Sequence, residues 1–161
     1  MARAALEALR LQRILWMPTG SPHYRAPART PAAHRVAMLR LAIEDEPRYA
    51  LDERELAPGH SGYTVDTLRS LGGKPVLLLG ADQVAKFETW HRWREILELA
   101  SIAVFARPGW TVPDARALCV PMQPLAISAS AIRARLARGE DVSDLIPPKV
   151  LDYIGRHRLY R

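Results

Sequence analysis

Ser128, Ser130 and Arg133 have residue types and a spacing that suit the binding of a phosphate group. The two serines stand at the start of a predicted helix over residues 130–137, and the arginine follows one turn later. Hydroxyl groups, the free backbone N–H groups of a helix start and a guanidinium all donate hydrogen bonds to anions. The same residues also fit a less specific interpretation, an ordinary serine cap with a surface arginine.

A second candidate is the segment Leu79-Gly80-Ala81-Asp82, which includes the end of an apolar run over residues 76–79. Glycine lets the backbone approach a ligand closely, and a carboxylate at the end of a strand accepts hydrogen bonds from ribose hydroxyls. The alternative is that Asp82 only caps the next helix.

Two further segments carry groups that can contact a nucleotide. The loop from Pro18 to Arg25 contains His23, Tyr24 and Arg25, which supply donors for phosphate. Three aromatic residues fall within residues 87–93, and some of them must belong to the core. Trp90 can instead stack on a flat ring, because an aromatic face tolerates varied geometry.

The elements that must position these residues alternate along the chain. Helical periodicity and stop signals predict helices over 2–11, from Pro31 to Pro47, over 64–71 with Thr64 as the cap, and over 93–100, 130–137 and 149–156. Short apolar runs predict strands over 14–17, 49–51, 76–79, 102–105 and 118–120. This alternation predicts one α/β domain over residues 1–161 with a doubly wound parallel sheet, in which ligands bind beyond the carboxyl ends of the strands.

Composition narrows the class of protein. The chain has 161 residues, 48% of them hydrophobic, and a net charge of +6, with arginines scattered rather than clustered. That distribution favours an arginine-rich surface on an enzyme for small anionic substrates over a nucleic-acid-binding module. Cys119 is the single cysteine, so a disulfide framework is excluded, and we expect it in the core.

Several other chemistries are excluded by the sequence. It contains no Gly-x-x-x-x-Gly-Lys-Ser/Thr loop, no Gly-x-Gly-x-x-Gly fingerprint, no Gly-x-Ser-x-Gly elbow and no histidines at metal-ligand spacing. No apolar run approaches the roughly 20 residues that span a bilayer. The start, Met1 to Arg13, is interpreted as a helix of the domain rather than a transit peptide, which predicts a cytoplasmic protein without membrane contact.

Taken together, these residues resemble the bacterial nicotinate-nucleotide adenylyltransferases along essentially the whole chain. The individual motifs are modest, but their order and spacing are specific. The matching segments are Trp16 to Arg25, His34-Arg35-x-x-Met38-Leu39-x-Leu41-Ala42, Asp52-Glu53-x-Glu55-Leu56, Ser61-Gly62-Tyr63-Thr64-Val65-Asp66-Thr67-Leu68, Leu79-Gly80-Ala81-Asp82, Phe87-x-x-Trp90, Arg107-Pro108-Gly109, Ile127-Ser128-Ala129-Ser130-x-Ile132-Arg133, Ile146-Pro147-x-x-Val150-x-x-Tyr153-Ile154 and Leu159-Tyr160-Arg161.

The resemblance implies a Rossmann-like nucleotidylyltransferase fold and a Mg²⁺-assisted reaction in NAD biosynthesis. ATP and nicotinate mononucleotide would give nicotinate adenine dinucleotide and pyrophosphate, by direct attack of the 5′-phosphate on the α-phosphorus. It implies catalytic roles for Ser130 and Arg133, and no metal ligand from the chain. ATP would contact His23, Arg25, Gly80, Asp82, Ile127, Ser128, Ser130 and Arg133, and the nicotinate nucleotide would contact Tyr63, Thr64, Trp90 and Arg107.

The sequence departs from the family at two places. The family reads Pro-Pro-His-Lys or Pro-Pro-His-Arg in the proline loop, whereas this chain has Pro22-His23-Tyr24-Arg25, so Arg25 is a safer phosphate contact than His23. The family also opens with a strand and Gly-Gly-x-Phe-Asp-Pro-x-His-x-Gly-His, whose histidines grip the ATP phosphates. No His-x-Gly-His occurs here, and Met1 to Leu6 resembles the helix that follows that motif. We therefore expect the first strand to be missing.

Four interpretations of the chain stay open, and the first two concern the missing motif. The first is a start assigned too late in an otherwise ordinary adenylyltransferase, which the upstream reading frame would test. The second is a truncated relative that binds nucleotide without catalysis. A basic nucleic-acid-binding module is the third, and a sister enzyme with another phosphate acceptor, such as phosphopantetheine, is the fourth.

Overall fold

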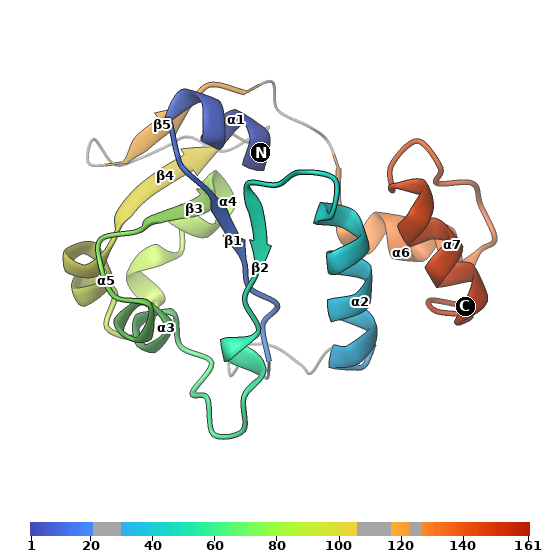
Figure 1. Cartoon of the computed structure of the whole chain (residues 1–161), viewed down its shortest axis with the longest axis horizontal. Helices are drawn as coiled ribbons and strands as arrows, with labels where there is room; N and C mark the ends of the chain where they lie inside the picture. Colours follow the sequence, from blue (N-terminus) through green and yellow to red (C-terminus); the bar gives the residue numbers. More distant parts are fainter. Residues whose placement is uncertain (21–29, 106–116, 123–126) are drawn as a thin grey trace. The chain divides into compact units, whose positions relative to one another are not determined.

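A computed structural model of the chain describes residues 1–20, 30–105, 117–122 and 127–161. The chain divides into two compact units, each assembled from two separated stretches (Figure 1). The first unit comprises Met1–Ile14 and Ser61–Ala126, and the second comprises Leu15–His60 and Ile127–Arg161. The expectation of a single domain over residues 1–161 stays a prediction.

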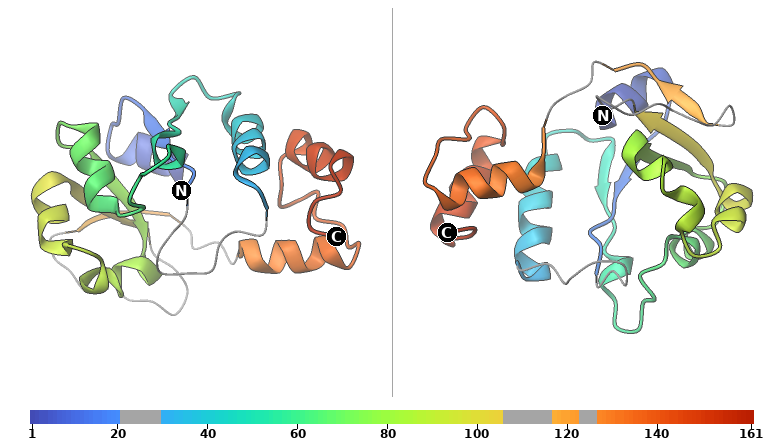
Figure 2. Two further views of the ribbon diagram at one scale, coloured as in Figure 1. Left: turned by 90° about the horizontal axis from the view of Figure 1, so that it is seen from below. Right: turned by 180° about the vertical axis from the view of Figure 1, so that it is seen from behind.

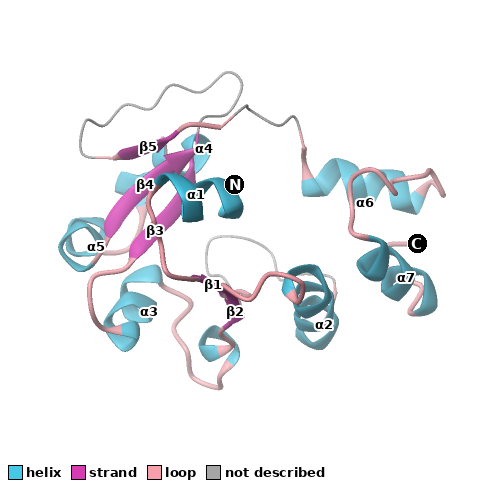
Figure 3. Ribbon diagram, turned by 45° about the horizontal axis from the view of Figure 1, so that its top comes forward, coloured by secondary structure: helices cyan, strands magenta, loops and turns pink. Residues whose placement is uncertain are grey.

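The first unit contains a three-stranded parallel sheet in the order β3-β4-β5 (Figure 3). Its strands are β3 (Val76–Gly80), β4 (Ser101–Phe105) and β5 (Leu118–Val120). The register pairs Gly80 with Phe105 and Phe105 with Val120, so all three strands end at the same edge. The predicted parallel sheet is confirmed, and its carboxyl edge is where ligands bind in folds of this class.

Helices that cover this sheet are short. They are α1 (Ala2–Ala8), α3 (Thr64–Leu71), α4 (Ala81–Val84) and α5 (Trp93–Leu99), with the 3-10 turn η2 (Phe87–Thr89). Gly72 ends α3 with φ +70°, a left-handed conformation that glycine adopts without steric cost.

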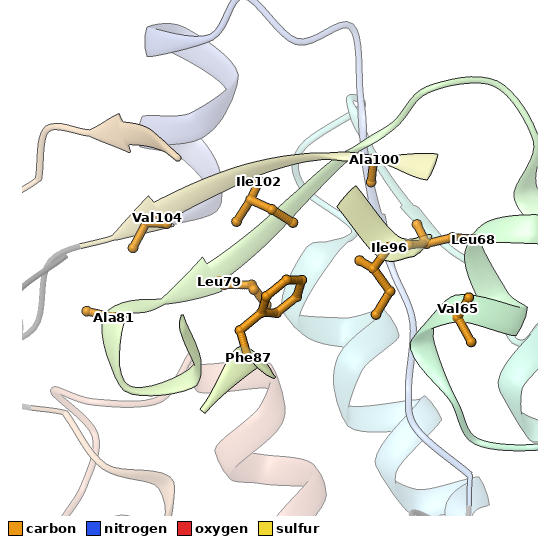
Figure 4. Close-up of a cluster of buried hydrophobic side chains, with 9 residues drawn as sticks. All are labelled: Val65, Leu68, Leu79, Ala81, Phe87, Ile96, Ala100, Ile102 and Val104. Carbon is orange, nitrogen blue, oxygen red and sulfur yellow. The ribbon is translucent and has the colours of Figure 1, made fainter. Parts of the chain in front are cut away.

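The core of the first unit lies between the sheet and helices α3 and α5 (Figure 4). Ile96 and Val65 are 0% exposed, and they meet Leu79 and Ile102 from the strands. The remaining core members in Figure 4 are Leu68, Ala81, Phe87, Ala100 and Val104. The apolar run of β4 is buried from Ile102 to Phe105, as expected for a strand covered on both faces.

The second unit contains a two-stranded sheet of β1 (Ile14–Trp16), whose first residue belongs to the first unit, and β2 (Tyr49–Leu51). Its helices are α2 (Ala32–Ile43), α6 (Ala129–Ala137) and α7 (Pro148–Arg156), with the 3-10 turn η1 (Arg54–Leu56) (Figure 2). Helices α2 and α7 pack through Met38, Val150 and Ile154. His34 Nδ1 and Tyr153 Oη lie 2.9 Å apart across the same contact.

The structure corrects three local predictions. Tyr63, in extended conformation, occupies the cap position of α3, and Thr64 is the first helical residue without a side-chain cap bond. Pro31 likewise precedes α2, which begins at Ala32. Cys119 is exposed rather than buried, because β5 is an edge strand of the described sheet and turns only Val120 into the core. Cysteine burial depends on which strand is at the edge, and that is a tertiary property.

Candidate active site

Gly80 and Asp82 lie at the carboxyl edge of the first unit's sheet. Gly80 is the last residue of β3 and the cap residue of α4, and Asp82 is the second residue of that helix. Gly80 rather than Asp82 occupies the cap position of α4, and Asp82 lies in the first turn of the helix. Its carboxylate is half-buried, and Gln83 Nε2 donates a hydrogen bond of 3.0 Å to Asp82 Oδ2. A carboxylate at this edge suits contact with ribose hydroxyls.

Tyr63 and Thr64 form the start of α3 on the flank of the same core. The Tyr63 ring stacks on the His91 ring at 4.2 Å between centroids and 30° between planes. Thr64 is half-buried at the first position of the helix. The first backbone N–H groups of a helix have no partner inside the helix, so this start presents polar donors beside an aromatic ring.

Trp90 follows the 3-10 turn η2 and is half-buried. Its ring lies 5.5 Å from the buried Phe87 ring, at an interplanar angle of 49°. Trp90 and Tyr63 both pack against the core cluster of the first unit. Phe87 is therefore a core residue, whereas part of the Trp90 ring stays exposed, and the stacking of Trp90 on a planar ring stays a prediction.

An ion-pair network supports the start of α3. Ser61 Oγ donates to Asp66 Oδ2 at 2.6 Å, and Arg69 Nη1 donates to Asp66 Oδ1 at 2.7 Å. The hydrogen bond from Ser61, more than the nearby Arg69, holds the pKa of Asp66 below its usual 3.8. Arg69 also pairs with Glu95 of α5 at 2.6 Å. Ser61 and Asp66 stand inside one of the family motifs, but the motif alone indicates no role for them.

The residues predicted to bind phosphate lie in the second unit. Ser128 is the cap residue of α6, Ser130 is in its first turn and Arg133 is one turn further on. The two hydroxyl oxygens lie 2.7 Å apart, and neither makes a side-chain cap bond to the helix. All three residues are exposed, as is Ile127 at 46%. The structure therefore brings the three donors to one helix start, with hydroxyls that are not engaged as caps.

Two contacts within the second unit fix the start of the proline loop, one at Thr19 and one at Gly20. Arg35 Nη1 donates a hydrogen bond of 2.7 Å to the carbonyl oxygen of Thr19. A Cβ at Gly20 would overlap with the carbonyl oxygen of Glu55, so only glycine allows this close approach. Arg35 is thus a supporting residue that the sequence indicated only as part of a motif.

Three predicted contacts, His23, Arg25 and Arg107, lie outside the described residues. Among the residues that the structure describes, no cluster of three or more His, Cys, Asp or Glu side chains is placed to hold a metal ion. Within that same part of the chain, no helix has the length and apolar character that crossing a membrane requires.

The chain matches the cytidylyltransferase-like family over residues 1–135. It is 42% identical over its full length to a protein of Laribacter hongkongensis, covering 86% of that protein. It is 44% identical over its full length to a protein of Bordetella petrii, covering 90% of it. Both relatives carry the name probable nicotinate-nucleotide adenylyltransferase.

The fold matches a solved structure of Plasmodium falciparum nicotinic acid mononucleotide adenylyltransferase complexed with NaAD, with a TM-score of 0.77. That match covers 93% of this chain and 83% of the other at 18% identity. It confirms the predicted α/β nucleotidylyltransferase fold. Together with the full-length identity to the bacterial relatives, it shows that the chain belongs to the cytidylyltransferase-like family and, within it, to the nicotinate-nucleotide adenylyltransferases.

Proposed function

We propose that the chain transfers the adenylyl group of ATP to nicotinate mononucleotide, producing nicotinate adenine dinucleotide and pyrophosphate. The observation that carries this proposal is the 42–44% identity, over the full chain, to relatives with that activity in their names. The candidate residues of both units agree with this activity. Those of the first unit offer aromatic and polar groups for a planar ring, and those of the second unit offer donors for phosphates. The reaction is a step of NAD biosynthesis, and we propose the cytoplasm as its location.

The first unit would bind the mononucleotide. Trp90 offers a half-buried face for the flat pyridine ring, and Tyr63 and Thr64 offer polar groups at the start of α3. Arg107 is proposed nearby from the family resemblance. Gly80 and Asp82, at the carboxyl edge of the sheet in the same unit, are proposed from the family resemblance to contact the ribose region of ATP.

The second unit would bind the triphosphate. Ser128 and Ser130 supply hydroxyl donors at the start of α6, and Arg133 supplies a guanidinium that pairs with phosphate through two parallel hydrogen bonds. His23 and Arg25 of the proline loop are proposed as further phosphate contacts, and Ile127 as a neighbour of ATP.

In the proposed reaction, a 5′-phosphate oxygen of the mononucleotide forms a bond to the α-phosphorus of ATP. The bond from that phosphorus to the bridging oxygen breaks, and its electron pair leaves with pyrophosphate. No covalent enzyme intermediate is needed, so the chain contributes positioning and stabilisation of charge. Arg133 and the hydroxyl of Ser130 would donate to the charge that develops on the leaving phosphates.

Mg²⁺ is proposed to arrive with ATP. This ion is usually held by substrate phosphates and waters with few protein carboxylates, so the chain has to supply phosphate donors rather than a cage of carboxylates. Ser128, Ser130 and Arg133 are donors of that kind. When bound, the ion supplies charge neutralisation on the leaving pyrophosphate.

The test is to incubate the chain with ATP, Mg²⁺ and nicotinate mononucleotide and to measure the dinucleotide and pyrophosphate. We expect both products in equal amounts, and a Trp90→Ala variant that raises the KM for the mononucleotide about tenfold, since base–aromatic stacking is worth about 1–3 kcal/mol per base. The matched control is Trp93→Ala, because Trp93 packs on the same core but carries Arg94 over its ring at 4.4 Å.

Three results would contradict the proposal in different ways. Binding of both nucleotides without product would favour the non-catalytic interpretation. Product with phosphopantetheine but not with nicotinate mononucleotide would reassign the acceptor. Salt-sensitive binding of DNA or RNA that ATP does not compete with would favour the nucleic-acid module.

A further inference from the structure

The hydroxyl of Ser61 connects the body of α3 to the backbone that precedes it. Ser61 Oγ donates to Asp66 Oδ2 at 2.6 Å and accepts a hydrogen bond of 3.2 Å from the N–H of Tyr63. Asp66 is the third residue of α3, and the cap residue Tyr63 makes no side-chain cap bond. The hydroxyl therefore ties the peptide of Tyr63 to a carboxylate on the helix.

The second oxygen of the Asp66 carboxylate accepts a hydrogen bond from Arg69. Arg69 Nη1 donates to Asp66 Oδ1 at 2.7 Å, and Arg69 also pairs with Glu95 of α5 at 2.6 Å. Arg92 pairs with the second oxygen of Glu95 at 2.6 Å. Helices α3 and α5 flank the same buried core (Figure 4), so the acceptor for Ser61 is anchored to two elements rather than one.

The backbone between Ser61 and Tyr63 needs a conformation that favours glycine. Gly62 has φ +74°, in the left-handed region, which lets the chain reverse so that the Tyr63 N–H reaches the Ser61 hydroxyl. On the far side, the Tyr63 ring stacks on the exposed His91 ring at 4.2 Å. Tyr63 is thus fixed through its backbone by Ser61 and through its ring by His91.

We propose that Ser61 and Asp66 are a positioning pair that orients Tyr63 and Thr64 for the nicotinate mononucleotide, an inference that rests on the proposed function. Neither residue touches the nucleotide in this proposal. Their contribution is to keep the start of α3 in one conformation before the ligand arrives, because a loosely held contact residue loses binding energy to ordering. The pair acts on the mononucleotide because Tyr63 and Thr64 are the residues that it orients, whereas Ser128, Ser130 and Arg133, proposed for the ATP phosphates, belong to the second unit.

The experiment measures equilibrium binding of nicotinate mononucleotide and, separately, of ATP to the full chain by calorimetry. Ser61→Ala should weaken mononucleotide binding about tenfold and leave ATP binding unchanged, because the variant loses a hydrogen bond to a charged group and part of that loss is transmitted to the ligand. Ser61→Thr, which keeps the hydroxyl, should restore the affinity.

A double-mutant cycle with Asp66→Ala tests whether the two residues act together. If they form one unit, the double variant binds the mononucleotide about as weakly as either single variant. The matched control is Ser143→Ala, which removes a hydroxyl that donates to Asp141 Oδ2 at 3.1 Å in the second unit. That control should leave the affinity for the mononucleotide at its original value.

The possible failures are distinguishable. If the unsubstituted chain does not bind nicotinate mononucleotide, the proposed function is overturned. If it binds and Ser61→Ala binds equally well, only the positioning pair is overturned. A loss of ATP affinity equal to the loss of mononucleotide affinity, or no recovery in Ser61→Thr, would indicate a general structural role and would also overturn the pair.

Discussion

At the scale of residues, the proposed function depends on hydrogen-bond donors that the fold leaves exposed. Ser128 and Ser130 lie at a helix start, but their hydroxyls bond to each other rather than to the helix. Arg133 is exposed on the same helix. Small polar side chains at a helix start normally stabilise that helix, and here they remain accessible to a ligand.

The prediction at this scale concerns the effect of Arg133 on catalysis. Arg133→Ala should lower kcat/KM for ATP about 100-fold, because a preorganised donor to developing charge has an effect of that size, while the thermal midpoint stays close to that of the unsubstituted chain. Steady-state kinetics with ATP as the varied substrate measure the effect. The control is Arg156→Ala, an exposed arginine paired with Asp152 on α7, whose surface ion pair contributes little. Equal kinetics for the two variants would remove Arg133 from the phosphate site.

At the scale of elements, the sheet of the first unit sets where the candidate residues lie. The parallel register brings Gly80, Phe105 and Val120 to one edge, and helices α3 and α5 pack on the same core as the strands. Ile96 is the member of α5 that is fully enclosed in that core. Removal of buried methyl groups leaves a cavity that the surroundings fill only partly.

Ile96→Ala should therefore lower the free energy of unfolding by about 2–5 kcal/mol. Urea titration followed by circular dichroism measures the change. Leu118→Ala serves as the control, because Leu118 is 46% exposed on β5 of the same unit and its truncation leaves no cavity. A loss at Ile96 no larger than at Leu118 would show that α5 does not depend on this core contact.

At the scale of the whole molecule, each unit has a carboxylate whose pKa is lowered by a local partner. The hydrogen bond from the Arg54 guanidinium holds the pKa of Asp52 below 3.8 in the second unit. The hydrogen bond from Ser61 does the same for Asp66 in the first unit. Glu140 and Asp141 of the second unit are shifted in the same direction by Arg138 and by the backbone of Ser143.

These shifts predict how stability changes with pH. A carboxylate with a lowered pKa in the folded state stabilises that state above its unfolded pKa and loses the contribution as pH falls through the folded value. The free energy of unfolding should therefore decrease below about pH 4, with the ionised carboxylates stabilising the fold near pH 7. Urea titrations at about pH 6 and about pH 3 measure the difference.

A double variant, Asp52→Asn with Asp66→Asn, supplies the control for this prediction. It should be less stable than the unsubstituted chain at the higher pH and should lose less stability on acidification, since two of the titrating groups are gone. An unchanged loss on acidification would show that neither carboxylate contributes to the pH dependence.

The sequence by itself determined the class of fold and the order of its elements, and it named the candidate site residues, whose roles stay predictions. Apolar runs such as Val76 to Leu79 and helical periods such as Val150 and Ile154 are local patterns, so they predicted strands and helices to within a few residues. The donors at Ser128, Ser130 and Arg133 were identified for the same reason, because their relation to a helix start is a matter of spacing along the chain.

Only the tertiary structure decided which residues support the site. The exposure of Cys119 depends on β5 lying at an edge of the described sheet, and the anchoring of α3 to α5 depends on Arg69 reaching Glu95. The hydrogen bond from Arg35 joins helix α2 to Thr19, a residue 16 positions earlier in the chain. Such relations arise when separate segments pack together, and no spacing pattern along the chain specifies them.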